Sequence, residues 1–211
     1  MKNLKTILPA LICAFAVLTA CNNKPAAEET TATTSSPSAE ETTYKVNKDN
    51  TSLVTWKGVM LGVKEHTGTL SFEEGTISTK AGQLTGGNLT IDLSTIATTD
   101  TNYNEKAGYG SAKLISHLLS PDFFDAAKFP TSSFVVNSVA GNTAKGTLTI
   151  RGKSNEETLN NIVITESEGT VKASGQLKFD RKKYDVKFDM PVKDMVISND
   201  VELNIELTGK K

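Results

Sequence analysis

The sequence predicts an all-β fold, an antiparallel β-barrel of about eight strands with one short helical insertion. In about eight segments, hydrophobic and polar residues alternate with a period of two, as in strands that have one buried and one solvated face. Most connections between these segments are short and polar. Closing such a sheet removes its exposed edges and leaves an interior that can hold one small ligand. A two-sheet sandwich with a filled interior is the alternative.

The first 20 residues have the pattern of a targeting signal. Lys2 and Lys5 precede an apolar run, Ile7–Val17, which is typical of a secretory signal peptide and too short to indicate a membrane span. The segment ends in Leu18-Thr19-Ala20-Cys21. An aliphatic residue, two small residues and a cysteine resemble the bacterial lipoprotein signal, so lipidation of Cys21 is expected. Ordinary secretion with a chance cysteine is the alternative.

Residues 21–42 are dominated by Thr, Ala, Glu, Ser and Pro. Such a segment cannot bury enough apolar surface to order itself, which predicts a flexible linker. The linker would join the lipidated Cys21 to one domain formed by residues 43–211. Because acyl chains insert into bilayers, we expect the protein in the cell envelope of a Gram-negative-type bacterium, anchored on the periplasmic side or the surface.

Cysteine and charge usage exclude several function classes. Cys13 would be removed with the signal and Cys21 would carry lipid, so no thiol remains for a disulfide, a metal or a nucleophile. Without the signal the chain has 21 basic and 24 acidic residues, a net charge of −3. No basic patch is interleaved with aromatic residues, so a nucleic-acid partner is not expected. The sequence does not indicate an oligomeric state.

The predicted strands each place one apolar set of side chains on a common face. In chain order the sets are Val54 and Trp56; His66, Gly68, Leu70 and Phe72; Leu89, Ile91 and Leu93; Phe134 and Val136; Leu148 and Ile150; Ile162 and Ile164; Val171, Ala173, Leu177 and Phe179; Val201, Leu203, Ile205 and Leu207. The expected turns are Glu74-Gly75, Ala81-Gly82, Gly141-Asn142 and Glu168-Gly169.

The helical insertion lies midway in the chain. Leu114, Ile115, Leu118 and Leu119 form one stripe of a helix over residues 111–120. A second short helical turn is expected next, with Ser120 as N-cap, Pro121 at its first position and Asp122 in its first turn. Phe123 and Phe124 would supply its apolar face, and Pro130 would end it. We call residues 111–130 the plug.

No motif of a serine hydrolase, zinc protease, nucleotide-binding loop or dithiol site occurs in the chain, so no catalytic residue, metal site or cofactor is expected. His66 faces the barrel interior or mouth, where it contacts a ligand or is a core histidine bonded to a backbone carbonyl. His117 faces the mouth or fixes the plug. No acidic or sulfur partner is placed near either histidine in the sequence, so they do not form a metal site.

Three further residues are candidates for ligand contact. Arg181 follows Phe179 by two positions, so it is expected on the inner face, where a buried arginine needs a partner. That partner is either a ligand head group or a carboxylate such as Asp125. Trp56 and Tyr184 are amphipathic aromatics that suit a pocket rim and ordinary packing equally.

Six motifs in order resemble the YceI family of bacterial periplasmic proteins. They are Ser52-Leu53-Val54-Thr55-Trp56-Lys57-Gly58, His66-Thr67-Gly68, His117-Leu118, Pro121-Asp122-Phe123-Phe124-Asp125 with Phe129-Pro130-Thr131, Gly146-Thr147-Leu148-Thr149-Ile150-Arg151-Gly152, and Phe179-Asp180-Arg181-Lys182-Lys183-Tyr184. The resemblance covers essentially the whole domain. It implies a lipocalin-like barrel that binds a polyisoprenoid chain. Two departures are a longer loop over residues 100–110 and a shorter run after Tyr184.

We therefore expect a lipid-anchored protein that holds a polyisoprenoid, such as a quinone-type lipid or a polyprenyl carrier, in the barrel interior. A solid-cored structural or stress-related module is the alternative, and an enzyme acting on lipid or glycan is a third hypothesis. The residues expected to contact the ligand are Trp56, His66, Leu70, Phe72, Leu89, Ile91, His117, Phe123, Phe124, Phe134, Phe179, Arg181 and Tyr184.

Overall fold

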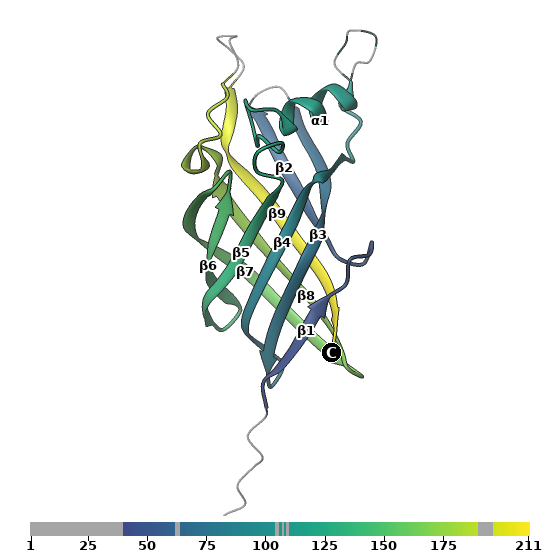
Figure 1. The fold of residues 1–211 in the computed structure, drawn as a ribbon, viewed down its shortest axis with the longest axis vertical. Coiled ribbons are helices and arrows are strands. Elements are labelled where there is room, and N and C mark those ends of the chain that lie inside the picture. The colour runs from purple at the N-terminus through teal and green to yellow at the C-terminus, as the bar shows by residue number, and fades with distance from the viewer. Residues whose placement is uncertain (1–39, 62–63, 104–105, 107, 109, 190–195) are drawn as a thin grey trace, which may run out of the picture. The chain divides into compact units, whose positions relative to one another are not determined.

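The computed structural model describes residues 40–61, 64–103, 106, 108, 110–189 and 196–211 (Figure 1). Its elements are β1 Thr42–Val46, β2 Leu53–Leu61, β3 Lys64–Lys80, β4 Gln83–Thr98, α1 Ser111–Leu119, β5 Thr131–Ala140, β6 Thr143–Ile150, β7 Lys153–Ser167, β8 Thr170–Asp180, the 3-10 helix η2 Arg181–Tyr184, and β9 Val196–Lys210. The expected signal peptide, Cys21 and most of the linker lie outside the described residues. No helix in the described part is long and apolar enough to cross a membrane.

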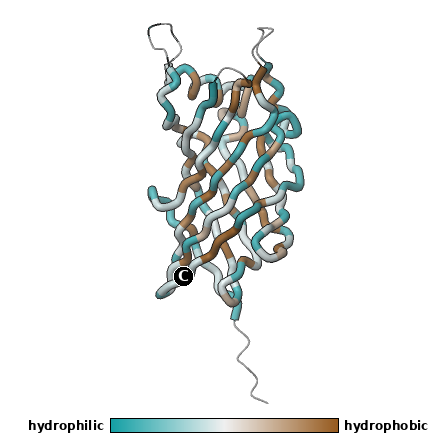
Figure 2. The backbone as a smooth tube through the Cα atoms, turned by 180° about the vertical axis from the view of Figure 1, so that it is seen from behind, coloured by the Kyte–Doolittle hydropathy of each residue, from teal (hydrophilic) through white to brown (hydrophobic). Residues whose placement is uncertain are grey.

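Eight of the described strands close into an antiparallel barrel. Neighbours pair in the order β3-β2-β9-β8-β7-β6-β5-β4, and β4 pairs again with β3 to complete the ring. This confirms the predicted all-β barrel with one short helical insertion and rules out the sandwich. The predicted alternation is also confirmed, and Figure 2 shows it as hydrophobic and hydrophilic residues that alternate along the strands. Helix α1 lies across one end of the barrel, the upper end in Figure 1.

Strand β1 is an additional strand that the sequence analysis did not identify. It lies at the barrel end opposite α1, where it pairs with residues 76–79 of β3 and 209–210 of β9. Strand β2 pairs with the same two neighbours nearer to α1. The short β1 therefore fills the gap between β3 and β9 that β2 leaves open, and its Tyr44 and Val46 add to the core.

One predicted turn is wrong and three are confirmed. Glu74 and Gly75 lie inside β3, next to a bulge between Phe72 and Glu74. A β-carbon on Gly75 would lie 2.9 Å from Leu89 and 3.0 Å from Val46, so this glycine permits close packing inside a strand. Ala81-Gly82, Gly141-Asn142 and Glu168-Gly169 do connect strands, with positive φ at Gly82, Gly141 and Gly169 as tight turns require.

The predicted second helical turn of the plug does not form. Ser120 ends α1 because its backbone N–H and its hydroxyl both donate to the carbonyl of His117, at 3.1 and 2.7 Å. Arg151 then donates to the carbonyls of Pro121 and Phe123. Those carbonyls are satisfied from outside the segment, and Asp125 adopts a positive φ of 50°. The segment after α1 is therefore a series of turns held against the barrel.

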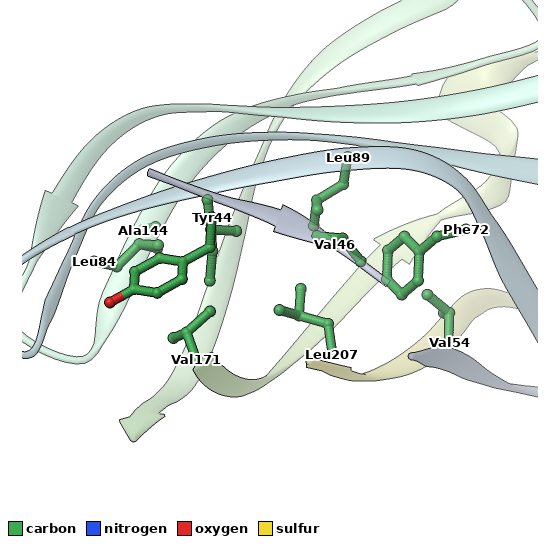
Figure 3. Packing of buried hydrophobic residues seen from close by; sticks show 10 residues of the cluster. Tyr44, Val46, Val54, Phe72, Leu84, Leu89, Ala144, Val171 and Leu207 are labelled. Carbon is green, nitrogen blue, oxygen red and sulfur yellow. The ribbon is translucent and has the colours of Figure 1, made fainter. Parts of the chain in front are cut away.

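The barrel end away from α1 is filled with side chains. Figure 3 shows Tyr44, Val46, Leu84, Val171 and Leu207 as members of one buried apolar cluster. Leu89, Phe72 and Val54 continue this cluster toward the middle of the barrel. These packed side chains occupy the interior of this end, and the hollows described below lie in the middle of the barrel and toward α1.

Candidate ligand-binding site

The middle of the barrel encloses an apolar hollow, which we call the inner cavity. Its volume is about 170 Å³, slightly more than an engineered apolar cavity of about 150 Å³ that binds benzene. Its lining is mostly aliphatic and aromatic. The residues that line it include Val54, Leu93, Ile96, Leu118, Leu148, Ile150, Leu159, Leu177, Val186, Ile197, Val201, Leu203 and Ile205, with Ser132, Ser133 and Ser198 as the small polar members. The presence of this hollow disfavours the solid-cored alternative.

A second hollow of about 400 Å³ lies at the α1 end, and we call it the mouth. It is more polar at its edge. Its lining includes Lys64, His66, Tyr103, Lys113, Leu114, His117 and Phe188. Five residues border both hollows, namely Trp56, Gly58, Leu118, Phe123 and Ile197. These five residues lie where the inner cavity and the mouth adjoin, and we call them the wall.

The structure brings most of the predicted site residues to these two hollows. Ten of them line the inner cavity: Trp56, Leu70, Phe72, Leu89, Ile91, Phe123, Phe124, Phe134, Phe179 and Arg181. His66 and His117 line the mouth. Tyr184 lines neither hollow, since its side chain is fully buried, donates to Glu157 at 3.0 Å and packs edge-on against Phe179. Burial raises the pKa of the Tyr184 phenol well above its ordinary value.

Several lining residues were not among the predicted contacts. Leu148, Leu177 and Leu203 had been assigned to the inner face of their strands, so the period-two pattern alone would have identified them. Ile197 has the same parity as Leu203, so extending the pattern to the start of β9 would have identified it as well. Val186 could not be found in this way, because it lies in the loop after η2, where no alternating pattern extends.

Arg181 is on the inner face as predicted, and of the two expected kinds of partner, a head group or a carboxylate, the structure shows the carboxylate. It is 1 % exposed and lies at the start of η2. It donates to the carbonyls of Ser198 (3.1 Å), Val186 (2.8 Å), Phe188 (2.7 Å) and Ile197 (3.4 Å) and to the carboxylate of Asp189 (3.0 Å). The carboxylate partner is therefore Asp189 and not Asp125. These five bonds use all five N–H groups of a guanidinium, which leaves none for a head group.

His66 is held by a carboxylate and not by the backbone carbonyl that one interpretation expected. Its Nδ1 lies 3.2 Å from Asp100, and its ring stacks on Tyr103 with centroids 5.2 Å apart. Burial alone would raise the pKa of Asp100. Bonds from the Thr67 and Asn102 N–H groups, the Tyr103 hydroxyl and His66 outweigh burial and hold that pKa below its ordinary value.

His117 joins the plug to the loop after η2. Its ring packs edge-on against Phe123 and Phe188, with centroids 5.0 and 4.5 Å away, and its Nε2 lies 3.8 Å from Asp122. Each histidine thus has an acidic neighbour, which contradicts the sequence-based expectation that neither has one. Among the described residues, no group of three or more His, Cys, Asp and Glu side chains is arranged to hold a metal ion.

Replacing Asp100 by Asn is expected to lower the free energy of unfolding by about 1–3 kcal/mol at pH 7, because several donors lose a charged acceptor. The folded-state pKa of Asp100 is lowered, so its contribution is present above the unfolded-state value and is lost as pH falls through the folded-state value. The difference between wild type and Asp100→Asn should therefore shrink between pH 5 and pH 2. Urea unfolding at both pH values measures it.

The matched control for this prediction is Asp122→Asn. The Asp122 side chain is 69 % exposed, and within the described part of the chain its one ion-pair contact is the long one to His117. Its replacement should change stability by less than about 1 kcal/mol. A stability difference for Asp100→Asn that grows toward low pH would show that the carboxylate network does not act in this way.

A closed antiparallel barrel with an apolar interior hollow defines a lipocalin-like protein, a class that encloses one small ligand. A family profile described as the YceI-like domain matches residues 44–209. The chain therefore belongs to the YceI-like family. A comparison with curated proteins found no match.

Solved structures of related proteins share this fold. BcnA of Burkholderia cenocepacia has 21 % identity and a TM-score of 0.60, over 74 % of this chain and 95 % of BcnA. A mutant of a Campylobacter jejuni YceI protein has 22 % identity and a TM-score of 0.51, over 66 % and 83 % of the two chains. A polyisoprenoid-binding domain from Saccharophagus degradans, implicated in plant cell wall breakdown, has 13 % identity and a TM-score of 0.51, over 79 % and 97 %. At these levels of sequence identity, the similarity shows a shared fold alone.

Proposed function

We propose that this protein binds an isoprenoid lipid, with part of the chain in the inner cavity and the rest in the mouth. The observation that carries the proposal is the apolar hollow inside a barrel whose far end is closed. Each five-carbon unit that leaves water contributes about 4 kcal/mol before ordering is deducted. A polyisoprenoid-binding domain of the same fold supports this class of ligand.

The size of the inner cavity limits how such a ligand can lie. About 170 Å³ holds a group not much larger than a benzene ring. A longer chain must therefore pass the wall formed by Trp56, Gly58, Leu118, Phe123 and Ile197 and continue into the mouth. The plug supplies two members of this wall, Leu118 and Phe123, so a long chain would pass beside both side chains.

Native mass spectrometry of protein purified without detergent tests the proposal directly. We expect a bound lipid mass, and we expect delipidated protein to take up farnesol or a longer polyprenol when either is offered. A folded protein that carries no lipid and takes up none of these compounds would overturn the proposal.

A substitution that adds a large side chain where the two hollows adjoin gives a second test. A β-carbon on Gly58 would meet no atom within 4 Å, and Gly58 borders both hollows. Gly58→Ile should therefore fold, since branched residues suit strands, and should bind farnesol at least tenfold more weakly in a titration. Gly86→Ile is the matched control, because Gly86 also has open space around its β-carbon position but lies outside both hollows. Equal binding by the two variants would place the ligand elsewhere.

The proposal includes a membrane anchor at Cys21 and a location in the bacterial envelope. It rests on the lipoprotein-like end of the signal and on the polar composition of the linker. Recovery of the full chain in the membrane fraction tests this part of the proposal, and recovery in the soluble fraction would oppose it.

A further inference from the structure

The indole N–H of Trp56 is buried without a hydrogen-bond partner. Trp56 is 7 % exposed. Its Nε1 is the one buried side-chain nitrogen or oxygen, among the residues that the structure describes, for which no acceptor is present. An unsatisfied buried donor costs about 1–3 kcal/mol, and native proteins rarely retain one without a reason.

The Trp56 ring packs directly against Gly68, which has no side chain and so leaves room for the indole. Trp56 pairs with Gly68 of β3 and with Leu203 of β9. The ring atoms Cζ2 and Cε2 lie 2.5 and 2.6 Å from the position that a β-carbon of Gly68 would occupy. The indole thus lies across the glycine, with Ile96 and Leu118 in the same apolar cluster. Its donor is fixed where no described group of the protein accepts from it.

Trp56 occupies the position that a long ligand must pass. It is one of the five residues of the wall between the inner cavity and the mouth. Leu118 and Phe123 of the plug belong to the same wall. A chain that connects the inner cavity to the mouth therefore comes into contact with the Trp56 ring.

We propose that Trp56 donates its indole hydrogen bond to an uncharged oxygen of the bound isoprenoid lipid, such as a carbonyl, ether or hydroxyl oxygen. This inference rests on the proposed function and narrows the ligand class. It places that oxygen of the lipid at the wall between the two hollows. The unsatisfied donor of the ligand-free protein is then satisfied in the complex.

The surroundings of Trp56 favour a neutral oxygen over a phosphate. The wall is apolar, and the one cation of the inner cavity within the described residues, Arg181, has all its N–H groups committed to protein acceptors. A phosphate there would be a buried charge without a partner, which is far more costly than a buried carbonyl that accepts one bond. Lys64 and Lys113 border the mouth and not the inner cavity.

A cycle of two proteins and two probes tests the inference. The probes are farnesylacetone and the hydrocarbon in which a methylene group replaces its carbonyl oxygen. The proteins are wild type and Trp56→Phe, which keeps an aromatic ring but has no N–H. Wild type should bind the ketone about 3–10-fold more tightly than the hydrocarbon. Trp56→Phe should lose this preference and favour the hydrocarbon, because the ketone oxygen is then buried without a donor.

A measurement on the wild-type protein alone avoids any folding defect of the variant. The chain has one tryptophan, so its indole N–H gives a single cross-peak in a ¹⁵N-labelled sample. We expect this proton to move downfield with the ketone and much less with the hydrocarbon.

The outcomes separate this inference from the proposed function. If wild type binds neither probe, the proposed function fails. If it binds both probes equally and the indole signal does not distinguish them, the inference is overturned and the function stands. Tighter binding of farnesyl phosphate than of the ketone, with the preference retained in Trp56→Phe, would also overturn the inference.

Discussion

Replacing Arg181 by Met is expected to lower the free energy of unfolding by about 3–5 kcal/mol. Methionine keeps the apolar stem that borders the inner cavity but removes every N–H group. Four carbonyl oxygens then lose a charged donor, and one of them belongs to the fully buried Val186. The Asp189 carboxylate is largely exposed and returns to water, so most of the loss comes from the carbonyls and from the loop that they hold.

Lys182→Met is the matched control for this prediction. Lys182 contacts the same Asp189 carboxylate at 3.2 Å, but its side chain is 41 % exposed and it bonds no buried carbonyl. Such a surface ion pair contributes less than about 1 kcal/mol. Thermal and urea unfolding followed by circular dichroism measure both variants. Equal stability of Arg181→Met and Lys182→Met would mean that the carbonyl bonds do not stabilise the fold.

The role of Arg181 also shows how a buried charge is accommodated beside an apolar cavity. The cavity is apolar, so a charged side chain at its edge has to be neutralised by bonds to the protein. Arg181 meets this requirement by joining β9 to residues 186–189, and Val186 and Phe188 from that segment line the inner cavity and the mouth respectively. The residue thus shapes the site by positioning its lining and not by direct recognition of a head group.

Much of this fold could be predicted because period-two alternation is a local property. Phe134, Leu148 and Leu203 face inward for the same reason that their neighbours face outward, and no distant contact is needed to infer it. The helix was predictable for the same reason. Strand β1 was missed because it is five residues long and adjoins a polar linker, so its pattern is too short to stand out.

What could not be predicted depends on partners that are remote in sequence. The turns after α1 replace a second helix because Arg151 bonds their carbonyls from 28 and 30 residues away. The carboxylate that accepts from Arg181 belongs to Asp189, which lies in a loop without any periodic pattern. Tyr184 is an amphipathic aromatic that suits a pocket rim and ordinary packing equally, and only the fold shows that η2 turns its ring into the core. Patterns of neighbouring residues therefore do not predict contacts between segments that are distant in the sequence.

Replacing Gly68 by Ala is expected to destabilise the barrel by about 3 kcal/mol or more and to displace the Trp56 ring. The added β-carbon would overlap the backbone carbonyl oxygen of Ala97 and lie 2.5 Å from Cζ2 of Trp56. Backbone cannot rotate aside as a flexible side chain can, so β3 and β4 would have to separate where Gly68 pairs with Thr98. Urea unfolding measures the stability, and the fluorescence of the single tryptophan reports the position of its ring.

Gly58→Ala provides the comparison at a glycine of the neighbouring strand. Gly58 lies two residues after Trp56, and an added β-carbon there meets nothing within 4 Å. Because the methyl group only restricts the unfolded chain, Gly58→Ala should match wild type or exceed its stability by up to about 1 kcal/mol. If Gly68→Ala were as stable as Gly58→Ala and kept the wild-type fluorescence, the close contact of the indole with β3 would be wrong. The proposed position of the Trp56 donor at the wall would then lose its structural basis.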